Sequence, residues 1–239
     1  MPAKTFAKCL ILVAVLGAMV IGSAYYPRTA KVIQIDVSAV LDARSVTTLN
    51  KGVLETWSTG IDKADGYLTM AAALSVGDLD PHALPDNPLF PATASHPGIL
   101  LHYSNETGLA HQTKCIPDSG EFVIKTPHHK YSGLWLSLTS SYGASNLEFE
   151  LGYADGVEKK NKLLPDWYND VPANDPDLAY VAHNMGKWDS NNKMKEKDHH
   201  NIHALNIHPD PSRVLTSVKV IKHAGGYLLF WAATGLLKD

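Results

Sequence analysis

Two stretches of alternating apolar residues between positions 131 and 167 constrain the fold of this chain more than any other feature. Apolar residues occupy every second position from Leu134 to Leu138 and, after the turn sequence SSYGAS, again from Leu147 to Tyr153. This period of two is typical of strands that bury one face and expose the other. Asp155-Gly156 then offers turn residues that tolerate positive φ, so that a following strand can pair back. The region predicts an antiparallel β-meander.

Further runs with strand character lie on both sides of the meander. The last of them, YLLFWAAT at 227–234, is apolar on both faces, which places it inside a sheet. No apolar pattern at helical spacing persists over three turns, and no internal repeat is present. We therefore predict an all-β fold, an antiparallel jelly-roll-like β-sandwich. The other predicted strands are Val32–Leu41, Ile99–Tyr103, Phe122–Lys125, Ile202–Ile207 and Val214–Ile221, with shorter apolar runs at 46–53 and 67–74.

Two long segments lack this pattern. Five prolines between Gly77 and Gly98 remove too many N–H donors for a ladder of strand hydrogen bonds. The segment 169–201 is rich in Asn, Asp, Lys and His, and only 179–182 resembles a strand. We predict surface loops in both places, where a β-sandwich often carries its function.

The N-terminus has the features of a secretory signal. Lysines precede an apolar run from Cys9 to Gly22, and small residues follow it up to Ala24. We predict a signal peptide at 1–24, a linker at 25–30 and one β-sandwich domain at 31–239, secreted and free of the membrane after cleavage. Cys115 is then the only cysteine, so no internal disulfide can form. Asn105-Glu106-Thr107 is a glycosylation sequon, as in a secreted glycoprotein.

Charge and composition restrict the partners of this 239-residue chain. The formal net charge is −3, which gives no electrostatic reason to expect nucleic acid. Only three arginines are present, and the guanidinium fork is the usual group for gripping phosphates or uronate carboxylates. A strongly anionic ligand is therefore disfavoured.

The order of several motifs resembles the galactose-binding-domain-like jelly rolls. These are KADGYLT near the start, the strand GILLHYS, YSGLWLSLTSS, the strand ending YADGV, PDWYND, an amide- and His-rich loop and a closing pair of strands. The chain is most similar to the secreted carbohydrate-binding modules of the NPCBM type that accompany glycoside hydrolases. This resemblance covers most of the chain from Val32 onward and implies a sandwich fold with carbohydrate as its ligand. No catalytic domain is attached, and no calcium site of the family can be matched residue by residue.

A cluster of rings and carboxylates lies after the meander, where a β-strand is expected to give way to a long loop. Sugar recognition needs an aromatic face for the apolar side of a pyranose, and carboxylates or amides for its hydroxyls. We predict a ligand-binding site from Asp166, Trp167, Tyr168, Asp170 and Trp188. The alternative is that Trp167 is a core residue and that Asp166 caps a turn.

Asp65 and Tyr67 complete the predicted site, because an early loop of such a fold can reach the same rim. The competing interpretation of Asp65 is a hairpin turn in which it bonds its own backbone.

Metal and catalytic alternatives have weaker support. His199, His200 and His203 are potential metal ligands, and His199 and His203 would share one face of a strand, but a solvated loop leading into a strand is the interpretation we adopt. Glu148 and Glu150 have a spacing compatible with a carboxylate pair, although their flanks are those of an ordinary exposed sheet face. We assign no catalytic residue, metal or cofactor.

We therefore expect a secreted protein that binds a neutral carbohydrate and does not catalyse a reaction on it. Two alternatives stay open, namely a polysaccharide-active jelly-roll enzyme, hydrolase or lyase, and a surface adhesion or interaction protein.

Overall fold

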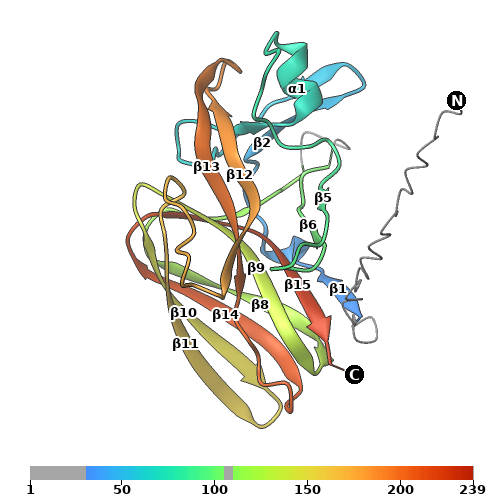
Figure 1. Ribbon diagram of the computed structural model, residues 1–239, viewed down its shortest axis with the longest axis vertical. Coiled ribbons are helices and arrows are strands. Elements are labelled where there is room, and N and C mark those ends of the chain that lie inside the picture. The colour runs from blue at the N-terminus through green and yellow to red at the C-terminus, as the bar shows by residue number, and fades with distance from the viewer. Residues whose placement is uncertain (1–30, 105–109, 239) are drawn as a thin grey trace, which may run out of the picture.

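Two antiparallel sheets face each other in the larger part of the molecule (Figure 1). The computed structural model describes residues 31–104 and 110–238, so the predicted signal peptide, the linker and the sequon lie outside the described residues. The first sheet has the order β1-β15-β9-β13-β12, and β7 also pairs with β15. The second has the order β11-β10-β14-β8. Their bounds are β1 Val32–Ile35, β7 Lys114–Ile116, β8 Gly120–His129, β9 Tyr131–Ser141, β10 Ser145–Tyr153, β11 Gly156–Leu164, β12 Leu178–Trp188, β13 Met194–Asn206, β14 Leu215–Ala224 and β15 Tyr227–Leu237.

The core between the sheets follows from the alternation in the sequence. The inward leucines of β9, at 134, 136 and 138, and Leu147, Phe149 and Leu151 of β10 are all buried in one hydrophobic cluster. Asp155-Gly156 joins β10 to β11 as predicted, with Tyr153 opposite Gly156 and the glycine at φ 146°. The predicted all-β antiparallel sandwich is confirmed. β15 lies inside its sheet, between β1 and β9, also as predicted.

The first predicted strand is shorter than its pattern indicates. β1 ends at Ile35, and a 3-10 helix, η1 (Ser38–Val40), replaces the rest of it. The carboxylate of Asp36 accepts hydrogen bonds from both the backbone N–H and the hydroxyl of Ser38, at 3.0 and 2.7 Å, and these turn the chain. The local side-chain bonds override the apolar alternation.

A smaller lobe stands at one end of the sandwich (Figure 1). The short helix α1 was not predicted, because six residues are too few to show helical periodicity. It packs with Leu68 and Trp188 in a separate hydrophobic cluster. The elements of the chain in and below this lobe are β2 Val46–Asn50, β3 Val53–Glu55, β4 Tyr67–Leu68, α1 Met70–Ser75, β5 Leu89–Phe90 and β6 Ile99–Leu100.

A long hairpin of β12 and β13 connects the two parts of the molecule (Figure 1). The prediction of a polar loop at 169–201 is wrong for most of its length, because β12 and β13 pair from Leu178 opposite Leu205 to Trp188 opposite Met194. The hairpin leaves the sandwich and extends beside α1, so its outer half has polar residues on both faces and shows no alternation. Within the described residues, no helix is long and apolar enough to cross a membrane.

Candidate functional site

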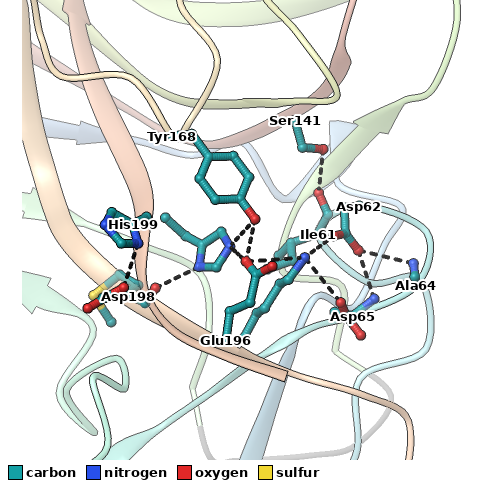
Figure 2. Close-up of polar contacts among 12 residues, drawn as sticks. Ile61, Asp62, Ala64, Asp65, Ser141, Tyr168, Glu196, Asp198 and His199 are labelled. Atoms are coloured by element: carbon teal, nitrogen blue, oxygen red, sulfur yellow. Dashed lines mark hydrogen bonds and ion pairs between the residues drawn. The ribbon is translucent and has the colours of Figure 1, made fainter. Parts of the chain in front are cut away.

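The ammonium of Lys187 contacts three carboxylates at the place where the β12–β13 hairpin passes the loop before β4. Its Nζ lies 3.1 Å from Asp62, 3.3 Å from Asp65 and 3.7 Å from Glu196. Lys187 and Glu196 face each other as a register pair across β12 and β13. We call these four residues, together with Tyr168 and His200, the Lys187 cluster (Figure 2).

The backbone of the loop at 60–66 fixes the two aspartates. One oxygen of Asp62 accepts hydrogen bonds from the N–H groups of Ala64 and Asp65, at 3.1 and 2.8 Å, while its other oxygen contacts Lys187. Gly66 then pairs with Trp188 through two backbone hydrogen bonds of 2.8 and 2.9 Å, which tie the loop to β12. Gly66 has to be a glycine, since a Cβ there would lie 2.1 Å from the Trp57 ring. Asp65 therefore lies in the turn and its carboxylate belongs to the cluster, whereas the carboxylate that bonds the backbone of the turn is that of Asp62.

Tyr168, His200 and Glu196 form a second group of contacts in the cluster. The Tyr168 hydroxyl donates a short hydrogen bond to Glu196, and the two side chains point toward each other in Figure 2. His200 Nε2 lies 2.9 Å from the Glu196 carboxylate and 3.2 Å from the Tyr168 hydroxyl. His200 Nδ1 donates to the carbonyl of Met185 at 2.7 Å, which fixes the tautomer and leaves Nε2 facing its two partners. The contact of 2.9 Å between Nε2 and the carboxylate requires a proton on His200 or on Glu196, so this proton and the hydroxyl proton of Tyr168 are both shared among the three groups.

The charges of the cluster are set by burial and by these neighbours. Burial opposes the charge on Lys187, but Asp62, Tyr168 and Glu196 together outweigh it and raise the pKa of the ammonium. Burial lowers the pKa of His200, while the Met185 carbonyl and the Glu196 carboxylate act in the opposite direction and favour the protonated ring. Burial and the bond to Glu196 raise the pKa of Tyr168 to about 12. Three acidic side chains therefore surround one lysine and one histidine, so acidic groups outnumber basic ones in the cluster.

Of the aromatic residues predicted for the site, only Tyr168 is open to solvent, with 45% of its surface exposed. Trp167, 1% exposed, lies beneath the cluster, with its ring 4.5 Å from that of His200 and 5.7 Å from Lys187 Nζ. Tyr67 is buried beside Trp167, with the ring centroids 6.5 Å apart. Trp188 is fully buried in the small lobe, and its indole N–H donates to Asp78 at 2.5 Å. All three rings are buried in hydrophobic clusters, Tyr67 and Trp167 in one and Trp188 in another, and none has a free face for a ligand.

The two remaining predicted aspartates have different places. The carboxylate of Asp166 binds backbone groups. Its two oxygens accept hydrogen bonds from the N–H groups of Gly143 and Tyr168, at 2.5 and 2.9 Å. The carboxylate of Asp170 is exposed, accepts from the Tyr180 hydroxyl at 3.2 Å and lies 3.9 Å from His183. Asp166 therefore positions Tyr168, and Asp170 points to a neighbouring part of the surface.

The histidines of β13 do not converge. A φ of 77° at His199 breaks the alternation of the strand, so His199 is exposed beside Asp198, while His200 and His203 are both buried. The prediction that His199 and His203 share a face is therefore wrong. Among residues 31–104 and 110–238, no group of three His, Cys, Asp or Glu side chains is arranged to hold a metal ion.

The glutamates of β10 are surface residues. Glu148 and Glu150 both contact Lys159 Nζ, at 2.8 and 2.7 Å, on the outer face of the second sheet. The lysine of the neighbouring strand bridges the two carboxylates, and this is the ordinary arrangement of charges across two strands.

A scan against protein-family models finds no match for this chain. A search of the curated proteins finds none either. The chemistry of the Lys187 cluster is therefore the main basis for a functional proposal.

Four members of the cluster were not predicted from the sequence, namely Asp62, Lys187, Glu196 and His200. Lys187 and Glu196 meet only through the register of the β12–β13 hairpin, which was itself not predicted. A signal for Asp62 was present in the sequence IDKADG, where an aspartate three residues before Asp65 can cap the same turn.

Proposed function

We propose that the protein binds a neutral carbohydrate at the Lys187 cluster, with Tyr168 as a stacking ring. The observation that carries this proposal is the half-exposed Tyr168 ring beside the Glu196 carboxylate, whose side chain is also 45% exposed. A pyranose offers an apolar face to such a ring and hydroxyls to such a carboxylate. Trp167 and His200 both contact the ring of Tyr168, so the tyrosine side chain loses little conformational freedom when a ligand binds.

The electrostatics favour a neutral ligand over an anionic one. Three carboxylates around one ammonium repel phosphates, sulfates and uronates, and Lys187 has no free charge to offer them. The resemblance of the motif order to NPCBM-type, galactose-binding-domain-like modules also supports a carbohydrate ligand. The apolar N-terminal segment supports an extracellular setting, in which neutral glycans are abundant.

The first test is binding of the purified protein to an array of neutral glycans, followed by Tyr168→Ala. Loss of the ring should weaken the best array ligand about 2- to 12-fold, the effect of one aromatic contact. Val157→Ala, an exposed apolar residue on β11, is the control and should bind normally. Absence of binding to every neutral glycan by the wild-type protein, or full binding by Tyr168→Ala, would reject the proposal.

A second candidate function is catalysis on a polysaccharide, and it rests on the protons shared among Tyr168, His200 and Glu196. Tyrosine and histidine at this distance can act as base and acid in proton transfer. Incubation of the wild-type protein with polysaccharides separates the two functions. New reducing ends or unsaturated products that disappear in His200→Gln would establish the enzyme, whereas binding without product would leave the binding protein.

A further inference from the structure

Tyr142 is an exposed aromatic residue in a backbone conformation that rarely accepts one. It lies in the turn between β9 and β10, has φ 58°, and exposes 66% of its surface. Bulky side chains are disfavoured at positive φ, where glycine and asparagine are usual. The ring is largely free of packing that would offset this disfavoured conformation, and such outliers concentrate at functional sites.

The turn that carries Tyr142 is fastened to the loop of the Lys187 cluster. The Ser141 hydroxyl donates to the carbonyl of Ile61 at 3.2 Å, next to Asp62, as Figure 2 shows. Inside the turn, the Ser140 hydroxyl donates to the carbonyl of Gly143 at 2.7 Å. The position of the Tyr142 backbone is therefore fixed relative to the carboxylates.

The same carboxylate, that of Asp166, holds the turns of both exposed tyrosines. One oxygen binds the N–H of Gly143, directly after Tyr142, and the other binds the N–H of Tyr168. The contacts continue from Tyr168 through Glu196 and Lys187 to the loop of Asp62, and from that loop back to the Tyr142 turn. These contacts form a closed ring, in which Tyr168 lies next to Glu196 and the turn of Tyr142 lies next to the loop of Asp62.

The electrostatic environment agrees with this placement. Burial, followed by the charge of Asp62, raises the pKa of Tyr142, and the charges of Lys187 and Asp65 also act on it. The charges of Lys187 and Asp62 act on the Tyr168 hydroxyl as well. Both hydroxyls therefore lie within electrostatic range of the same charged groups.

We infer that Tyr142 is a second stacking ring of this site, and that the ligand is a neutral oligosaccharide of at least two hexose units. This inference rests on the proposed function. Each tyrosine offers a face to one sugar ring, and the carboxylates of the cluster accept hydrogen bonds from hydroxyls between them. On this inference, a single hexose occupies one ring, and a second unit is needed to occupy the other.

The test is calorimetric titration of the full chain with neutral hexose oligosaccharides of one to six units, chosen from the series of the best array glycan. The wild-type affinity should rise from one unit to two or three. Tyr142→Asn removes the ring but tolerates positive φ, and Tyr142→Gly does so as well. In both variants, the gain of the longer ligands over the single hexose should shrink about 2- to 12-fold. Val157→Ala should keep the wild-type gain.

The outcomes separate this inference from the proposed function. Binding that depends on Tyr168 but has the same affinity at every ligand length, or a length gain unchanged in both Tyr142 variants, would overturn the inference and leave the function. Absence of binding to all these oligosaccharides by the wild-type protein would overturn both. Thermal unfolding of each variant shows that the fold is kept, because relief of the positive φ should hold or raise the midpoint.

Discussion

His203 shows at the scale of one residue how burial alone can make stability depend on pH. It lies on β13 with no exposed surface, and neither ring nitrogen has a hydrogen-bond partner among the described residues. Burial lowers the pKa of His203 from 6.5 to about 4. The folded protein accepts the neutral ring only, whereas the unfolded chain takes up a proton below about pH 6.5.

We therefore expect His203 not to affect the pH dependence of the unfolding free energy above pH 6.5. As the pH falls from 6.5 toward 4, protonation of His203 in the unfolded chain should lower this free energy. The shift corresponds to about 3 kcal/mol of unfolding free energy between these limits. Urea unfolding from pH 7.5 to 4.5 measures it. His203→Leu should flatten this part of the profile, and His199→Gln, at an exposed position, should leave it unchanged. Parallel profiles for His203→Leu and the wild type would contradict the explanation.

Single residues of the site could be predicted only where a local pattern marks them. Asp65 and Tyr168 stand beside a turn signal and a Trp-Tyr pair, and the structure brings both to the Lys187 cluster. Tyr142 was part of a turn sequence, and its positive φ is not visible in the letters SSYGAS. Trp167 and Trp188 have polar neighbours in sequence, yet strands distant in the chain cover them.

At the scale of elements, strand alternation predicts the sandwich and fails where a strand leaves it. β9 and β10 bury every inward residue of their pattern, because a second sheet covers one face. β11 carries Glu, Lys and Asn between its ends, and only the Asp155-Gly156 turn predicted it. The outer half of the β12–β13 hairpin lies outside the sandwich, so no second sheet imposes a period on it.

Trp188 ends β12 and forms the centre of the small-lobe cluster, with Leu68, Ala72 and Ala73 around it. We expect Trp188→Ala to lower the free energy of unfolding by about 3–5 kcal/mol, since it leaves a large cavity and an unpaired Asp78. Urea unfolding at neutral pH tests this. Leu79→Ala, next to Asp78 but 89% exposed, is the matched control and should stay near the wild type. A wild-type midpoint for Trp188→Ala would show that the ring is not part of the core.

At the scale of the whole molecule, the β12–β13 hairpin joins the sandwich and the small lobe into one structural unit. Leu178 and Leu205 belong to the core between the sheets, Ile202 and Ala204 to the neighbouring cluster, and Trp188 to the cluster of the small lobe. The hairpin as a whole therefore cannot detach without opening all three clusters.

We therefore expect a single cooperative unfolding transition. Tryptophan fluorescence, which reports on Trp188 and Trp231 in different clusters, should give the same urea midpoint as far-ultraviolet circular dichroism. Two separated transitions would show that the small lobe unfolds independently of the sandwich.

β11 borders the second sheet and carries lysines at positions 159, 160 and 162. An edge strand invites a strand from another molecule, and this is how sheets grow into aggregates. A second copy of β11 added there would bring these rows of lysines close to one another. The strand that completes the sheet thus also opposes its extension by a strand of another molecule.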